Sequence, residues 1–240
     1  MNAVEKTRIS FYRKMPGVFF LLFLLFSLGT KAQKMQMIKG YCGIYYRSMD
    51  DLYRQKQVEL DFYQFRPGQQ VASIGAQCSH WEAMYAAASD SIDFYLQDID
   101  TSFFNPRQTA FAWHYYDSLR GKPMTSTYQM VLGTEHSTGL PEQFFDKIMI
   151  INSFHEFTDQ AGMLADLRRK LKKDGILYID EAVPRKSGQK HGVCKLPMLM
   201  PEEMIQLLQK NGFTLTGSID IEFRVNKTYR KIYAFRPGSL

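Results

Sequence analysis

The sequence predicts an α/β domain: a mostly parallel sheet with helices on both faces, followed by an antiparallel hairpin. Two observations lead to this prediction. From about residue 49 to residue 212, short apolar segments alternate with segments of helical composition, which is the order that parallel strands and crossover helices produce. Residues 214–224 and 229–235 then alternate between apolar and polar side chains on either side of Asn226-Lys227. That pattern is typical of two strands joined by a turn.

The segment 69–100 contains a complete strand–helix–strand unit. Its strand, helix and second strand are predicted at residues 71–74, 80–88 and 92–96. Gly75 follows the first strand and lacks a Cβ, so the chain can turn sharply there. In a parallel unit, this turn and the end of the second strand lie at the same edge of the sheet, where open α/β sheets bind ligands. A helix N-terminus and an acid after the second strand, Asp98, together predict a nucleoside site.

The remaining elements follow from the same signals. Further helices are predicted at residues 49–64, 107–119, 160–172 and 201–210. Further strands are predicted at residues 128–132, 146–152 and 176–179, which brings the expected sheet to seven strands. Pro106 begins the second of these helices, because proline is favoured in the first helical turn. Asp174-Gly175 is expected to end the third.

Length, charge and cysteine content limit the organisation and the partners. The 240 residues suit one α/β domain, at residues 34–240. The formal net charge of the chain is +6. Residues 1–32 contain five basic groups and one acid, a net charge of +4, so the rest of the chain has a net charge of +2. This weak charge, without a basic run among aromatics, argues against a nucleic-acid partner. Cys42, Cys78 and Cys194 allow at most one disulfide, and their spacing does not select the pair.

Residues 1–33 have the pattern of a secretory signal peptide. A basic segment up to Lys14 precedes an apolar run from Val18 to Leu28, and small residues follow, with cleavage expected near Ala32. The run is shorter than the roughly 20 residues of a membrane span. An uncleaved N-terminal anchor is the alternative. Both interpretations place the domain outside the cytoplasm, in the periplasm or cell envelope, with membrane contact through the leader alone.

Several segments carry residues at the positions of known sequence motifs. Residues 71–79 correspond to a glycine-rich first motif, Asp98 to an acidic ribose-binding position, and residues 133–135 to a loop near an adenine ring. Residues 145–148, followed by 152–157, correspond to a fourth-strand motif. In this order, from about residue 49 to 235, the chain resembles the class I S-adenosylmethionine-dependent methyltransferase family. The resemblance implies a Rossmann-like three-layer α/β/α sandwich and S-adenosylmethionine as the cofactor.

The resemblance also implies a set of cofactor-binding residues: Ser73, Gly75, Ala76, Gln77, Asp98, Glu135 and Asn152. The first motif of the family has an acid followed by three glycines, E/D-x-G-x-G-x-G. In this chain Ser73 stands at the acidic position, Gly75 is kept, and Gln77 and Ser79 replace the other two glycines. A glutamine at such a turn can crowd the methionine end of the cofactor. The alternative interpretations are an ordinary strand–helix turn and, for Asp98, a solvated strand end.

His155 and Glu156 are the predicted catalytic residues. They follow the fourth strand, at the edge where a methyl acceptor would meet the donor, and histidine can act as a general base near neutral pH. A His-Glu pair that caps the next helix is the alternative, since methyl transfer can also proceed by positioning alone. His191 and Cys194, with Glu181 before them, have a spacing that a metal could use. A structural zinc site usually has four ligands, so we predict no metal ligands.

Three functions are compatible with these observations. The first is an S-adenosylmethionine-dependent methyltransferase that acts on a small molecule. The second is an exported protein of the same fold that binds a ligand without catalysis, because the leader directs the chain away from a cytoplasmic methyl donor. A nicotinamide-dependent enzyme is the third. It is favoured less, because the glycine pattern of residues 71–79 fits the pyrophosphate of a dinucleotide less well than it fits S-adenosylmethionine. The sequence does not predict the oligomeric state.

Overall fold

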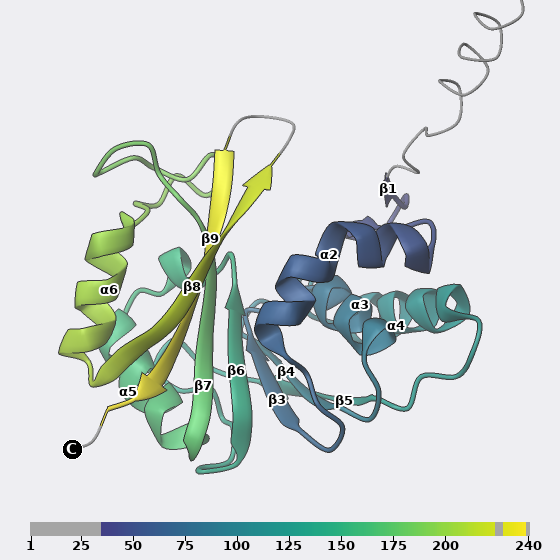
Figure 1. Ribbon diagram of the computed structural model, residues 1–240, viewed down its shortest axis with the longest axis horizontal. Coiled ribbons are helices and arrows are strands. Elements are labelled where there is room, and N and C mark those ends of the chain that lie inside the picture. The colour runs from purple at the N-terminus through teal and green to yellow at the C-terminus, as the bar shows by residue number, and fades with distance from the viewer. Residues whose placement is uncertain (1–34, 224–227, 239–240) are drawn as a thin grey trace, which may run out of the picture. The chain divides into compact units, whose positions relative to one another are not determined.

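The structure is a computed structural model that describes residues 35–223 and 228–238 (Figure 1). The predicted leader and the turn at Asn226-Lys227 lie outside these described residues. Within them, no helix is both long enough and apolar enough to cross a membrane.

A seven-stranded sheet forms the centre of the described chain, as predicted. The strands lie in the order β5-β4-β3-β6-β7-β9-β8. Their bounds are β3 (Gln70–Ile74), β4 (Asp93–Asp98), β5 (Thr127–Leu132), β6 (Phe145–Ile151), β7 (Leu171–Ala182), β8 (Phe213–Phe223) and β9 (Thr228–Pro237). The pairs among β3 to β7 are parallel, and β9 pairs antiparallel with both β7 and β8. The strand order reverses between β3 and β6, and such a switch point leaves a crevice at the carboxyl ends of the strands.

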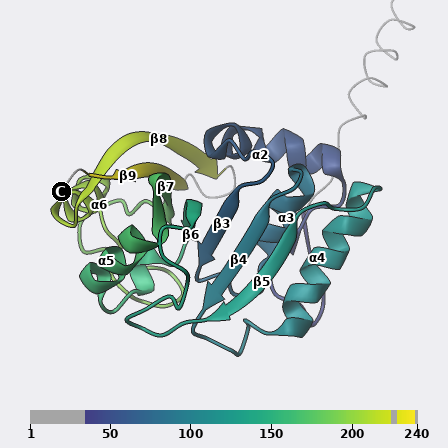
Figure 2. The same ribbon diagram turned by 90° about the horizontal axis from the view of Figure 1, so that it is seen from below.

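Helices cover both faces of the sheet. Their bounds are α2 (Met49–Tyr63), α3 (His80–Ala88), α4 (Pro106–Arg120), α5 (Gln160–Lys170) and α6 (Pro201–Lys210). Figure 2 shows α3 and α4 on one face and α5 and α6 on the other. A hydrophobic core lies on each face of the sheet, one against α3 and α4 and one against α5 and α6. Successive residues of β6 alternate between these cores, because strand side chains alternate in direction. Met149 packs in the core beside α3 and α4, and Ile148 and Ile150 pack in the core beside α5 and α6. The predicted three-layer sandwich is therefore confirmed.

The largest difference from the predicted bounds lies between α5 and β7, where β7 begins five residues before the predicted strand at 176–179. Helix α5 ends at Lys170, and β7 begins at Leu171 without an intervening turn. The predicted stop at Asp174-Gly175 is wrong, because this dipeptide lies inside β7, where the register with β6 shifts. A Cβ on Gly175 would come within 2.8 Å of the Phe145 carbonyl oxygen. The glycine thus permits a close approach of two backbones. From sequence alone, a glycine with this role looks the same as a glycine that ends a helix.

The segment before α2 forms a small sheet that the sequence did not predict. Strands β1 (Gln36–Met37) and β2 (Ile44–Tyr45) pair antiparallel. Cys42 forms a disulfide with Cys78, 36 positions along the chain, with their Cα atoms 6.1 Å apart. Tyr45 packs edge-on against Phe111 and Tyr115 of α4. The disulfide therefore ties this segment to the turn that follows β3.

Candidate active site

A cavity of about 290 Å³ opens at the carboxyl edge of the sheet. It is lined by the turn after β3, the end of β4, and the loops that follow β4, β5 and β6: Ile74, Gly75, Gln77, Gln97, Asp98, Ile99, Asp100, Thr134, Glu135, Ser153, Glu156, Phe157, Thr158 and Met163. Small-molecule pockets range from about 300 to 1,000 Å³, so this cavity is at the lower end of that range. The cavity lies at the switch point between β3 and β6, where the topology of the sheet predicts a ligand.

The turn after β3 keeps the backbone of a glycine-rich loop although most of its glycines are replaced. Gly75, Gln77 and Ser79 have φ angles of 74°, 45° and 52°, all in the left-handed region that glycine adopts most easily. These are the three glycine positions of the family motif. Gln77 is exposed and forms part of the cavity wall, so it narrows the site without filling it. Each non-glycine residue in this region costs on the order of 1–2 kcal/mol.

Gly75 is the position in this turn where a glycine is required. A Cβ at this position would lie 2.5 Å from the Oγ of Ser153. That hydroxyl in turn donates a hydrogen bond to the carbonyl oxygen of Ile74, at 3.0 Å. The loop after β6 and the turn after β3 are thereby held against each other at the base of the cavity.

Asp98 lies at the end of β4 and is buried, with its carboxylate engaged by backbone amides. Its Oδ1 accepts hydrogen bonds from the amides of Ile99 and Asp100, at 2.7 and 2.9 Å. Its Oδ2 accepts one from the amide of Gln77, at 2.7 Å. A carboxylate has about four acceptor positions, so one remains on Oδ2. Asp98 can therefore both fix the turn and accept a hydrogen bond from one hydroxyl of a ligand.

A buried acid behind the turn was missed by the sequence reasoning. Ser73, which stands where the family motif has its acid, donates a hydrogen bond of 2.5 Å to the Oε1 of Glu82 in α3. Burial and, to a lesser extent, the nearby charge of Asp98 raise the pKa of Glu82 to about 7, against the opposing effect of this hydrogen bond. The sequence signal for this position is weak: an acid among the alanines of a short apolar helix.

His155 is buried and pairs with Glu181. It belongs to a short 3₁₀ turn, η1 (Phe154–Glu156), and its Nδ1 lies 2.9 Å from the Oε2 of Glu181 at the end of β7. Burial lowers the pKa of His155, but the hydrogen bond and charge of Glu181, together with the nearby Cys194 thiol, outweigh it and raise the pKa to about 9. An imidazole that keeps its proton at neutral pH is a poor general base.

The structure divides the predicted site residues into two groups. Gly75, Gln77, Asp98, Glu135 and Glu156 all line the cavity. Outside the lining are Ser73, Ala76 and His155, which are buried, and Asn152, which is exposed. The amide of Asn152 donates a hydrogen bond to the Asp180 carbonyl oxygen, at 2.7 Å. Cofactor binding and catalysis by the residues of either group remain predictions. A possible metal-binding group, His155, His191 and Cys194, lies beside the cavity.

Comparisons with known proteins agree with this geometry. Residues 104–179 match the family model of a methyltransferase domain. Among curated proteins, none matches the chain. A SAM-dependent methyltransferase from Aquifex aeolicus is similar in structure, with a TM-score of 0.58 and 17% identity over 78% of this chain and 95% of that one.

Two further solved structures extend the likeness. One is the 1,6-didemethyltoxoflavin-N1-methyltransferase of Burkholderia thailandensis, with a TM-score of 0.59 and 16% identity over 78% of this chain and 79% of that one. The other is the [4+2]-cyclase SpnF, with a TM-score of 0.59 and 15% identity over 92% of this chain and 94% of that one. The resemblance drawn from the sequence is thereby confirmed: this chain has the fold of the class I S-adenosylmethionine-dependent methyltransferases.

Proposed function

We propose that this protein binds S-adenosylmethionine in the cavity beside Gly75 and transfers its methyl group to a small molecule. The observation that carries the proposal is that the cavity is open between Gly75 and Asp98, although two glycines of the motif are replaced. The turn keeps the left-handed backbone at all three glycine positions, so its shape is preserved where its sequence is not. The Burkholderia enzyme, whose structure contains S-adenosylhomocysteine, supports this choice of ligand.

The residues of the cavity have separate tasks in this proposal. Asp98 accepts a hydrogen bond from a ribose hydroxyl through the free position on Oδ2. Gly75 allows the methionine part of the cofactor to approach the backbone of the turn. The exposed carboxylate of Glu135, on the loop after β5, faces the side of the cavity expected to hold the adenine.

The reaction needs little chemistry from the protein. A nucleophile on the acceptor attacks the methyl carbon, the carbon–sulfur bond breaks, and its electron pair returns to sulfur to give S-adenosylhomocysteine. The proton of the acceptor passes to a base or to water. Glu156 lines the cavity and is the carboxylate suited to accept it, whereas His155 keeps its own proton. Most of the rate enhancement then comes from positioning the two reactants in line.

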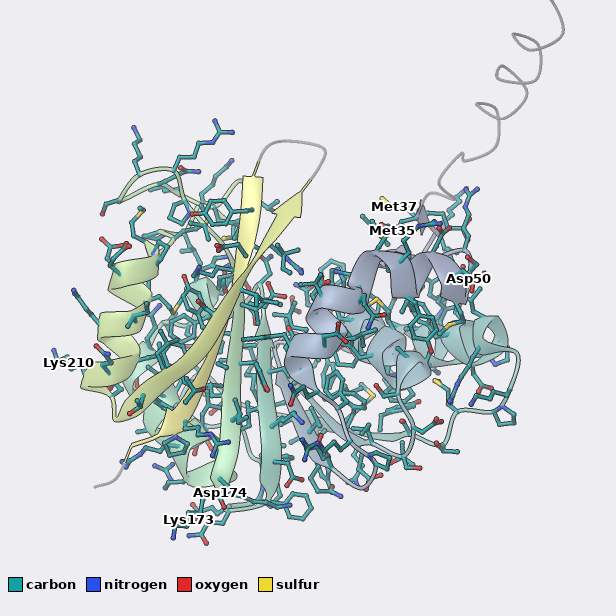
Figure 3. All side chains as sticks on the ribbon, viewed as in Figure 1. Met35, Met37, Asp50, Lys173, Asp174 and Lys210 are labelled. Atoms are coloured by element: carbon teal, nitrogen blue, oxygen red, sulfur yellow. A yellow bond between two sulfur atoms is a disulfide. The ribbon has the colours of Figure 1, made fainter. Side chains whose placement is uncertain are left out.

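Calorimetry on the full chain tests the cofactor assignment. Titration with S-adenosylmethionine is expected to show one saturable site. Asp98→Asn is expected to weaken binding at least tenfold, because it removes the negative charge that accepts hydrogen bonds from the ribose hydroxyl and from the backbone amides of the turn. Asp174→Asn is the matched control, since Asp174 is exposed near the start of β7, away from the carboxyl edge (Figure 3). Absence of heat at millimolar ligand would remove the proposal.

A second candidate function is an exported binding protein without methyl transfer. The Cys42–Cys78 disulfide favours it, because disulfides persist in oxidising compartments outside the cytoplasm, where S-adenosylmethionine is scarce. The likeness to a [4+2]-cyclase shows that a fold alone does not determine the reaction. Fractionation of cells that express a C-terminally tagged chain separates the two: recovery in the cytoplasm with free Cys42 and Cys78 thiols would exclude export.

A further inference from the structure

Three potential metal ligands from two distant segments meet beside the cavity. His155 comes from the turn after β6, while His191 and Cys194 come from the loop between β7 and α6. One ligand atom from each lies within 4.8 Å of the other two. The Nδ1 of His191 is 3.2 Å from the Sγ of Cys194, and the rings of His155 and His191 are 4.5 Å apart.

The side chain of His155 gives an independent indication of a ligand. It is only 3% exposed, and its Nε2 makes no hydrogen bond to the described residues. A buried polar atom without a partner is costly. The other ring nitrogen is held by Glu181 at 2.9 Å. A carboxylate on one ring nitrogen and a free position on the other is the arrangement of metal-binding histidines, in which the carboxylate fixes the direction of the ring.

The loop that supplies the other two ligands is itself ordered by hydrogen bonds. Lys190 and Pro197 form an antiparallel bridge. Inside it, the amide of His191 donates to the carbonyl oxygen of Leu196, at 2.8 Å, and the amide of Lys195 to that of His191, at 3.2 Å. The loop is therefore a small hairpin that presents His191 and Cys194 together on the side of His155.

We propose that His155 Nε2, His191 and Cys194 bind one zinc ion. Two imidazoles and a thiolate are nitrogen and sulfur ligands, which zinc favours and which magnesium and calcium do not. Tetrahedral zinc, with bonds of about 2.0–2.3 Å, needs ligand atoms roughly 3.3–3.6 Å apart, so small side-chain rotations close the site. The ion takes the place of a proton on Nε2. The three ligands do not bind the cofactor in the proposed function, and Glu156, which lines the cavity, is the residue that the two sites share.

A fourth coordination position is available on the side of the cavity. The Oε1 of Glu156 lies 3.8 Å from the Nε2 of His155, and Glu156 also lines the cavity. Three protein ligands with an open fourth position are typical of catalytic rather than structural zinc. Glu156 therefore either completes the coordination or accepts a hydrogen bond from a water on the metal.

Metal analysis of the full chain tests this inference. After treatment with a chelator and dialysis against zinc, we expect one zinc per chain. His191→Ala and Cys194→Ser should each weaken zinc binding at least tenfold, and Glu181→Gln should weaken it about 10–100-fold. His114→Ala, an exposed histidine on α4, is the matched control and should bind zinc like the wild type. The two loop substitutions lie on the surface hairpin, and circular dichroism checks that each variant is folded.

Cobalt provides a readout that does not depend on activity. The cobalt-substituted protein should show a thiolate-to-cobalt charge-transfer band in the near ultraviolet, and Cys194→Ser should abolish it while His114→Ala keeps it. Zinc affinity that is unchanged in both His191→Ala and Cys194→Ser would overturn the proposal, as would a wild-type chain that retains no zinc at micromolar concentration. Neither result would bear on cofactor binding in the cavity, which the calorimetry measures separately.

Discussion

Replacing Glu82 by glutamine tests the buried acid behind the cofactor turn. Glu82 has a pKa near 7 in the folded protein instead of 4.5, so between these values the folded protein keeps a proton that the unfolded chain has released. Its contribution to stability is therefore fully present below about pH 4.5 and is lost as the pH rises through about 7. A shift of this size corresponds to roughly 3 kcal/mol, at about 1.4 kcal/mol per pH unit.

A glutamine side chain does not ionise in this pH range, so the variant does not lose this contribution to stability. Its free energy of unfolding, relative to that of the wild type, should increase by roughly 3 kcal/mol between about pH 4.5 and pH 8. Urea unfolding of both proteins across this range measures the difference, and the subtraction cancels groups that titrate equally in both. Parallel pH profiles, with a difference that stays constant within about 0.5 kcal/mol, would show that Glu82 does not titrate as the structure implies.

Three further substitutions test the turn itself. Cys42→Ser removes the disulfide to Cys78, 36 residues away, and should cost about 4 kcal/mol in urea unfolding under non-reducing conditions; an unchanged midpoint would contradict this. Gly75→Ala should abolish S-adenosylmethionine binding and destabilise more than the control Gly68→Ala, which has a similar φ of +82° but open space around it; equal effects would exclude the steric argument. Gln77→Gly should raise stability by about 1 kcal/mol and strengthen cofactor binding in calorimetry, and weaker binding would show that the glutamine contacts the ligand.

Much of the fold could be predicted because its signals are local. The bounds of α3 and α6 match the predicted ranges 80–88 and 201–210, since turn residues mark the ends of both segments. The end of α5 could not be predicted, because Leu171 already pairs with Phe145 of β6 and so begins β7. Likewise, the Cys42–Cys78 disulfide depends on the position of the N-terminal segment over α4, which no local pattern shows.

The candidate site could be predicted only in part, for the same reason. Asp98 and Gly75 were found because their places, at the end of β4 and directly after β3, follow from the order of elements. Glu82 was missed, because its role depends on burial against Ser73 and not on a motif. Although His191 and Cys194 were noted as a pair, their contact with His155, more than thirty residues earlier in the sequence, exists only in the folded chain.

The central claim is that the space between Gly75 and Asp98 holds the nucleoside of a methyl donor. A crystal structure of the protein with S-adenosylhomocysteine tests this claim most directly. We predict density for the ligand in this space, with one ribose hydroxyl about 2.5–2.7 Å from the Oδ2 of Asp98. An empty cavity at saturating ligand, or a ribose bound away from Asp98, would contradict the account.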